Sequence, residues 1–341
     1  MAILHNAFDE TVQLIRNGFV TIPLDTGTRG TGLEKFMYLN HSLIPRVEKW
    51  LTERSRKRAR HLGVSIEEPL PQPAVVAAIT DIYVSAMWYK NGMHLYRVDS
   101  SLMRALEDAE MPDILMEEVR LPFPSIGILF QGEDGSPTPI RIGNSLVQRV
   151  TLFQDSEMLF LSFEYTEDRD REIYWGASVG VPCESTLRWS QLFENAKEFY
   201  RADISRSSEI TDQRMTENKM IFKFLLYLMC DNVDLLKDYS RHQALQGVKG
   251  PKRDRIEQEW KFKPTIYTVG SKFRAMKRPE RPAGIDEQHW HLKYRIQVAG
   301  HWRNQPVGKG HAQRKRIFIE PFWKGPTMSE AIIKDHEVKL P

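Results

Sequence analysis

The sequence predicts an α+β protein with a helical N-terminal portion, a central, mostly antiparallel sheet and a basic C-terminal β-hairpin region. Three observations predict this fold class. Apolar residues recur at helical spacing before residue 110, period-2 alternation dominates the middle of the chain, and the last hundred residues combine alternation with many basic side chains.

Composition places the chain among ordinary globular proteins. It has 341 residues, of which 41% are apolar and 27% are charged, and this balance excludes collagen-like and intrinsically disordered classes. The longest dense apolar stretch, residues 220–230, is far shorter than the roughly 20 residues that a membrane-spanning helix needs. We therefore expect a protein that does not contact a membrane.

The N-terminal third reads as a series of helices. Segments 7–17 and 33–61 show helical spacing, and the strongly apolar segment 74–90 follows two prolines and ends at Asn91-Gly92, a pair typical of a left-handed helix cap. A short extended piece, residues 95–98, then precedes Asp99, which is a natural N-cap for a helix over 102–109. The basic run at 54–60 reads either as a solvated helix end or as a phosphate-binding segment.

Strand signals fill the middle of the chain. In the segment 158–166, Leu159, Leu161, Phe163 and Tyr165 alternate with more polar neighbours, which is the signature of a half-buried strand. Helical patterning returns at 187–200 and 215–239, and the polar, Gly- and Pro-broken run 244–255 predicts a linker or mobile loop.

We place the domain boundaries at these changes of pattern. A mainly helical region covers 1–120, a sheet with helices covers 121–243, and a basic C-terminal region covers 256–341. Charge divides the chain at nearly the same point, because residues 241–341 carry a net charge of +12 and residues 1–240 carry −9. Such asymmetry indicates a C-terminal surface that faces a polyanion.

The strongest functional signal lies between Gly300 and Gly325, where two alternating segments enclose a glycine-containing loop. Basic side chains alternate there with rings, and this mixture suits nucleic acid because cations neutralise phosphates while rings stack on bases. An inward-packed hairpin whose basic residues are only solvated is the structural alternative. The candidate nucleic-acid-binding residues are Trp302, Arg303, Lys309, Arg314, Lys315, Arg316 and Lys324.

Histidines near this segment raise two chemical possibilities. His289 and His291 have a pitch suited to metal ligands, but the spacing to His301 and His311 fits no standard zinc pattern, so we expect neither a metal nor another cofactor. The second possibility is metal-independent RNA cleavage with a histidine as general base. The candidate catalytic residues are His301, His311, Arg303 and Lys315. A binding or adaptor role is favoured over an enzymatic one.

Aromatic residues in and after the segment 74–90 suggest a third kind of site. Trp88, Tyr89 and Tyr96 are candidates to bind a peptide, by strand addition at a sheet edge or in an aromatic cleft. Ordinary core packing is the alternative for the same rings. The absence of a basic and then apolar N-terminal segment, together with only two cysteines, favours the cytoplasm over a secreted location.

Scattered features in a fixed order resemble a known protein family. They are AMWYKNGMHLYRVDSSLMRAL, KFLLYLMC, TIYTVGSKFR and the Gly-His-Trp segment with its Gly-x-Gly basic hairpin, together spanning residues 75–325. The string resembles the type V-A anti-CRISPR family of phages and plasmids whose members lower production of the effector nuclease. The positions that match its pattern are Trp88, Tyr96, His301, Trp302, Arg303, Gly308, Gly310 and Arg314.

The resemblance implies a function. It implies recognition of a CRISPR effector nuclease, or a similar target, as a nascent polypeptide at the ribosome, followed by down-regulation of its mRNA in the cytoplasm of a prokaryotic host. The implied partners are therefore a nascent chain and an mRNA or ribosome. A metal-independent ribonuclease and a nucleic-acid-binding accessory protein of a mobile element are the alternatives from the residues alone.

Overall fold

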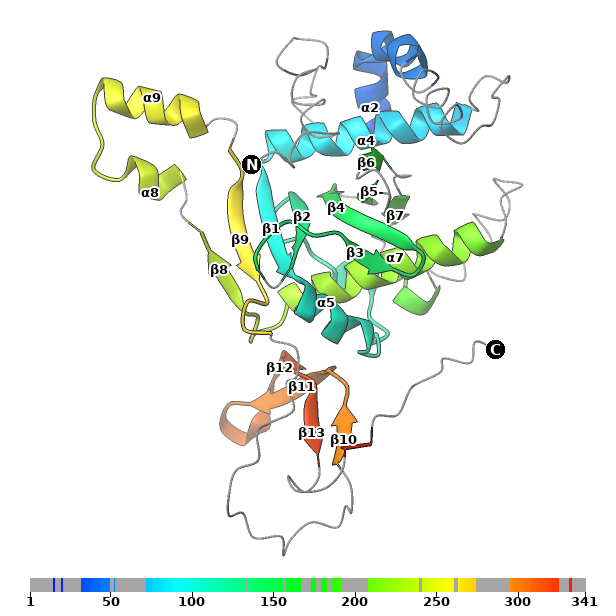
Figure 1. Cartoon of the computed structure of the whole chain (residues 1–341), viewed down its shortest axis with the longest axis vertical. Helices are drawn as coiled ribbons and strands as arrows, with labels where there is room; N and C mark the ends of the chain where they lie inside the picture. Colours follow the sequence, from blue (N-terminus) through cyan, green and yellow to red (C-terminus); the bar gives the residue numbers. More distant parts are fainter. Residues whose placement is uncertain are drawn as a thin grey trace, which may run out of the picture.

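The fold was analysed in a computed structural model of the chain (Figure 1). The structure describes residues 15, 20, 32–49, 52, 72–132, 134–155, 158–166, 173–175, 179–182, 186–191, 208–238, 241–260, 263–273, 295–324 and 331–332. Most of the predicted helix 7–17, the whole basic run 54–60, and most of the predicted helix 187–200 lie outside the described residues.

A mostly antiparallel sheet forms the centre of the molecule, as predicted. Its strand order is β6-β5-β4-β2-β1-β9-β8, with β3 paired to β4 and β7 paired to β5. The strands are β1 (His94–Asp99), β2 (Ser125–Gln131), β3 (Ile140–Ile142), β4 (Ser145–Gln154), β5 (Met158–Thr166), β6 (Ile173–Trp175), β7 (Val179–Pro182), β8 (Leu235–Lys237) and β9 (Thr265–Val269).

The middle of this sheet departs from antiparallel pairing. Strand β1 lies parallel to both β2 and β9, with Leu95 opposite Gly127 on one side and Ile266 on the other. A parallel pair needs a long crossover between its strands, and the chain supplies one by inserting α5 between β1 and β2 and most of the remaining sheet before β9. The last strand, β8, pairs antiparallel with β9 and forms one end of the described sheet.

Helices cover both faces of the sheet (Figure 1). The apolar helix α4 (Gln72–Lys90) packs over β2, β4 and β5, where its Tyr83 contacts the rings of Phe153 and Phe160. A preceding short helix, α2 (Gly32–Leu39), and a 3-10 turn, η1 (His41–Leu43), pack against α4 and complete the helical N-terminal portion.

The opposite face carries the larger core, beneath α5 (Ser100–Glu107) and α7 (Ser208–Leu228). Asp99 caps α5 as predicted, because its side chain accepts a hydrogen bond from the backbone N–H of Ser101 at 2.7 Å. A short 3-10 turn, η2 (Met116–Glu118), follows α5 and adds Met116 to this core. Helix α7 ends close to the C-terminal hairpin, so this face supports the candidate site.

The predicted linker 244–255 is wrong for most of its length. The chain forms α8 (Arg241–Leu245) and α9 (Pro251–Trp260) there, and only the turn between them lacks regular structure. Pro251 begins α9 at the first helical position, where a missing N–H costs nothing. The glycines and proline therefore punctuate two helices, which lie beyond the β8–β9 end of the sheet in Figure 1.

The C-terminal portion contains a hairpin and a small separate sheet. Strands β11 (His301–Val307) and β12 (Gln313–Ile319) pair antiparallel, joined by the 3-10 turn η3 (Lys309–His311), which confirms the predicted hairpin. Strand β10 (Arg295–Val298) pairs instead with β13 (Phe322–Lys324) and β14 (Ala331–Ile332). Among the described residues, no helix has the length and apolar character needed to cross a bilayer.

Candidate nucleic-acid interface

The β11–β12 hairpin has two distinct faces, which follow from its register. Trp302 lies opposite Phe318, and Arg303 lies opposite Ile317. Because successive side chains of a strand point to opposite faces, Trp302 and Phe318 share one face, the inner face. His301, Arg303 and Lys315 belong to the other, the outer face.

The inner face packs onto the main core. Phe318 is 1% exposed, and its ring makes edge contacts with Tyr227 of α7 at 5.7 Å and with Trp302 at 5.2 Å between centroids. The Nε1 atom of Trp302 is buried as well. A Cβ atom at Gly300 would lie 2.6 Å from the Phe318 ring, so the residue before His301 must be glycine for the hairpin to begin here.

Backbone hydrogen bonds fix the hairpin to the end of α7. The side chain of Asn232 donates to the Phe318 carbonyl at 2.8 Å and accepts from the Phe318 N–H at 2.9 Å. The N–H of Asp231 donates to the Arg316 carbonyl at 2.9 Å. The loop after α7 thus hydrogen-bonds to the edge of β12 that does not pair with β11, and this holds the hairpin in one orientation relative to the body.

Two of the predicted nucleic-acid-binding cations are paired with carboxylates of the body. Arg316 donates to Glu118 at 2.8 Å, and this hydrogen bond holds the pKa of the Glu118 carboxyl below its ordinary value. Lys315 lies 3.6 Å from Asp231, with both side chains about half exposed. A solvated pair of this kind contributes little stability, so Lys315 is available to another anion whereas Arg316 has a structural partner.

The remaining cations of the hairpin point into solvent. Arg303, Lys309 and Arg314 are exposed and make no ion pair with any other described residue. Lys309 sits in the hairpin turn, where Gly308 and Gly310 adopt positive φ angles of 80° and 68° that glycine tolerates. Lys324 is exposed on β13, outside the hairpin. We define the cationic surface as Arg303, Lys309, Arg314 and Lys315.

The candidate catalytic residues divide into two places. His301, Arg303 and Lys315 share the outer face, and His311 lies in the hairpin turn. Six residue steps separate His301 from the last pair of the ladder, a span of about 20 Å at the usual rise of a strand. The two histidines therefore cannot act as base and acid on one phosphodiester.

No grouping of three or more metal-ligating side chains occurs within the described ranges. His289 and His291 lie outside them. The one cysteine that the structure describes, Cys230, is buried and free, and burial raises the pKa of its thiol to about 12.

The three candidate peptide-binding rings lie at the α4–β1 junction. Trp88 is 1% exposed, donates from Nε1 to the His94 carbonyl at 2.8 Å, and lies under the Arg149 guanidinium. Tyr96 is 2% exposed and stacks on Tyr267, and burial raises the pKa of its hydroxyl. Tyr89 is partly buried beside this cluster. These placements are those of core aromatics, and the structure assigns no peptide to them.

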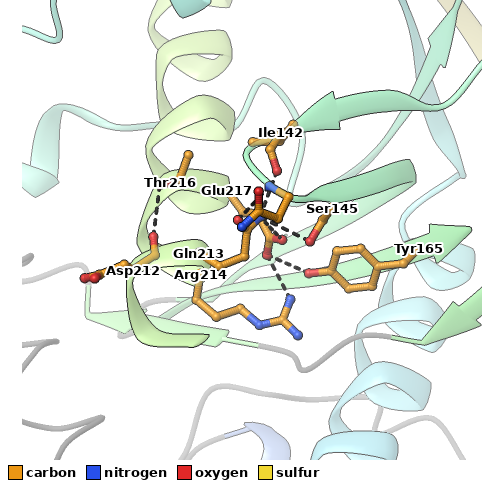
Figure 2. Close-up of polar contacts among 9 residues, drawn as sticks. Ile142, Ser145, Tyr165, Asp212, Gln213, Arg214, Thr216 and Glu217 are labelled. Atoms are coloured by element: carbon orange, nitrogen blue, oxygen red, sulfur yellow. Dashed lines mark hydrogen bonds and ion pairs between the residues drawn. The ribbon is translucent and has the colours of Figure 1, made fainter. Parts of the chain in front are cut away.

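A polar network that the sequence analysis did not identify joins α7 to the sheet (Figure 2). Glu217 is 0% exposed and accepts hydrogen bonds from Tyr165 at 2.7 Å, Arg214 at 2.8 Å and Gln213 at 2.9 Å. Gln213 also donates to the Ile142 carbonyl at 2.7 Å. The sequence did contain a signal for this network, namely an acidic residue on the apolar stripe of α7. Glu217 precedes the buried Ile221 by four residues and therefore lies on that stripe.

Comparisons with known proteins give the chain its family. None of the curated proteins matches it. Among solved structures, the crystal structure of AcrVA2 aligns with 94% of this chain and 95% of its own, at 15% identity and a TM-score of 0.40. The family model described as "Anti-CRISPR type V subtype A2 family" matches residues 96–325, which include nearly all of the sheet, α7 and the hairpin. The chain belongs to this anti-CRISPR family.

Proposed function

We propose that this protein lowers production of a type V-A CRISPR effector nuclease by recognising the nuclease as a nascent chain and directing the loss of its mRNA. Membership of the anti-CRISPR family supports the target class. The observation that carries the RNA part is the cationic surface, whose Arg303, Lys309 and Arg314 have no carboxylate partner among the described residues. Action on a translating message implies the cytoplasm of a prokaryotic host.

A surface for the nascent chain is available at strand β8. Asp234 accepts a hydrogen bond from Gly270, and Asp238 donates one to Ile266, so both residues face β9. By alternation, the backbone groups of Leu235 and Lys237 point away from β9. No described strand pairs with that side. An extended peptide adds to an edge of this kind through main-chain hydrogen bonds.

The side chains at this edge favour an apolar segment of the nascent chain. Leu235 is 40% exposed and Leu236 is 51% exposed, so each can contact an apolar side chain of an added strand. Of the two modes considered for a peptide, strand addition therefore has more support than the cleft lined by Trp88 and Tyr96. Linking a weak peptide site to a weak RNA site gives avidity on a translating ribosome without a tight site for either.

A reconstituted translation reaction tests the proposal. Two messages would be compared: the effector nuclease transcript, and the same transcript with a compensated frameshift that changes the first encoded residues while keeping nearly every nucleotide. We expect the protein, with a host extract, to deplete only the unshifted transcript, and only while translation proceeds. Equal depletion of both, or depletion without translation, would rule out recognition of the nascent chain.

The ribonuclease alternative is separated by using purified components. His301 is the better placed of the two candidate bases, since it shares the outer face with Arg303 and Lys315. If the protein is an adaptor, the variant without His301 and His311 should keep its affinity for the peptide, and depletion of the transcript should require a host nuclease. Cleavage of RNA by the purified protein that is lost in the His301→Ala variant would instead establish an enzyme.

A further inference from the structure

We infer that the cationic surface binds base-paired RNA through its phosphate groups and does not bind single strands through stacked bases. This inference rests on the proposed function, in which RNA is the partner of the hairpin, and it specifies the class of RNA. The hairpin residues 301–319 contain five Lys and Arg residues and no Asp or Glu. Complementarity to a polyanion is therefore built into the hairpin itself.

The rings of the hairpin pack against the body, Phe318 fully and Trp302 in part. Single-strand binding proteins pair a basic groove with aromatic faces on which bases stack. Here Phe318 is 1% exposed and Trp302 packs edge-on against it, with its indole nitrogen buried. Phe318 therefore offers no free face to a base while the hairpin stays docked, and the contact with Phe318 and the core covers part of Trp302. Cations without rings suit recognition of a phosphate backbone.

The backbone positions that carry the cations are also held at fixed separations. Arg303 and Lys315 are diagonal neighbours on the outer face, about 7–8 Å apart at the backbone. The Asn232 hydrogen bonds and the Arg316–Glu118 pair hold the strands that carry them. Charges carried on fixed strands suit the regular phosphates of a duplex, whereas a single strand must lose conformational freedom to fit them.

The turn extends this array beyond the body of the protein. Lys309 lies in the turn, and Arg314 lies near it, opposite Pro306. By alternation, Arg314 lies on the side of the ribbon that carries Trp302 and Phe318. The ribbon thus carries Arg303 and Lys315 on its outer face, and Lys309 and Arg314 at its tip. Duplex RNA is recognised largely by shape and by contacts to phosphate and ribose. A folded segment of mRNA and a helix of ribosomal RNA present the same A-form chemistry to such a surface.

Fluorescence anisotropy with the full-length protein tests this inference. The probes are a 16-base-pair RNA duplex, either of its single strands, and the DNA duplex of the same sequence, each titrated over a series of salt concentrations. We expect the RNA duplex to bind at least about tenfold more tightly than the single strand, with a log–log salt slope of about −3 to −4 for four phosphate contacts. Tighter binding of the single strand, or equal binding of RNA and DNA duplexes, would overturn the inference.

A matched pair of variants shows whether the hairpin is responsible. Arg303→Gln/Lys309→Gln/Arg314→Gln is expected to weaken duplex binding at least tenfold and to reduce the salt slope by about 3. Lys252→Gln/Arg253→Gln/Arg255→Gln on α9 removes the same charge from another exposed element and is expected to change affinity less than about twofold. Equal losses in the two variants would show that only net charge matters and would overturn the assignment.

The same variants separate this inference from the proposed function. If the hairpin variant loses duplex binding but still depletes the unshifted transcript, the RNA assignment and nascent-chain recognition both stand, and the RNA part of the proposed function fails. If the native protein depletes only the unshifted transcript but does not bind duplex RNA, the RNA assignment fails and nascent-chain recognition stands. If the native protein binds duplex RNA but depletes both transcripts or neither, the RNA assignment stands and the proposed function fails.

Discussion

The Glu217 network and the cationic surface both contain charged side chains, but those of the network are paired inside the protein and those of the surface are exposed to solvent. Glu217 is fully buried and accepts from three donors, so its charge is neutralised inside the chain (Figure 2). Arg303, Lys309 and Arg314 are exposed and have no carboxylate partner among the described residues. The Glu217 network holds α7 on the sheet, whereas the cationic surface can bind another molecule.

Substitution of the buried carboxylate should have the largest effect. In Glu217→Ala, the donors from Tyr165, Arg214 and Gln213 lose an acceptor that is itself fully buried. We expect a loss of about 4 kcal/mol in the free energy of unfolding, as for other broken buried pairs. Urea denaturation measures it, with Glu257→Ala as the control because its pair with Arg253 on α9 is exposed.

The control should lose no more than about 0.5 kcal/mol. If Glu217→Ala costs as little as the control, the network does not hold α7 on the sheet. The Glu217 network would then not differ from the exposed charges in its contribution to stability.

The buried lysine of α7 should make the stability of the protein depend on pH, which exposed cations do not. Lys223 is 6% exposed and donates to the Glu107 carbonyl at the end of α5, and burial lowers the pKa of its ammonium from 10.5 to about 8. Between these values the unfolded chain binds a proton that the folded chain does not, so stability rises with pH. The charged form therefore costs about 3 kcal/mol of stability below pH 8.

Denaturation at pH values from 7 to 10.5 checks this expectation. The difference between the native protein and Lys223→Met isolates the buried group from the other titrating residues. We expect the variant to be the more stable of the two at pH 7 and this advantage to shrink as the pH rises. Lys219→Met, an exposed lysine one turn away, is the control, and parallel pH curves for all three proteins would contradict the prediction.

The Arg316–Glu118 pair lies between the two extremes, because it is partly buried and joins the hairpin to the body. A double-mutant cycle with Arg316→Gln and Glu118→Gln should give a coupling of about 1 kcal/mol. The pKa of Glu118 is lowered in the folded state, so the coupling is present at neutral pH and disappears as the pH falls below about 4.5. The same cycle on Lys315 and Asp231, which are both half exposed, should give a coupling near zero.

The sequence was sufficient to predict the hairpin, and the structure explains why it was not sufficient to predict which rings are free. Alternation places Trp302 and Phe318 on one face of the ribbon. Which face is covered depends on Tyr227 and Asn232, about 90 residues earlier in the chain, and no local pattern records that contact. The interleaved rings therefore read as a stacking surface although they anchor the hairpin.

The sheet shows the same division between local and distant information. Period-2 alternation was sufficient for β5, and the Asp99 cap was sufficient for the start of α5. The parallel pairing of β1 with β9 joins segments about 170 residues apart, and nothing in either segment states its partner. Glu217 was visible as a polar residue on an apolar stripe, but its donor Tyr165 from β5 was not, nor was the bond from Gln213 to the Ile142 carbonyl of β3.

The smallest effect on stability is expected at the cationic surface. Arg303→Gln, Lys309→Gln and Arg314→Gln remove exposed charges that have no partner among the described residues, so each variant should unfold within about 0.5 kcal/mol of the native protein. Urea denaturation of the single variants and of their combination measures this. A larger loss would mean that these cations hold the hairpin in place, as Arg316 does. Unchanged stability together with lost RNA binding is the outcome that separates a contact surface from a structural one.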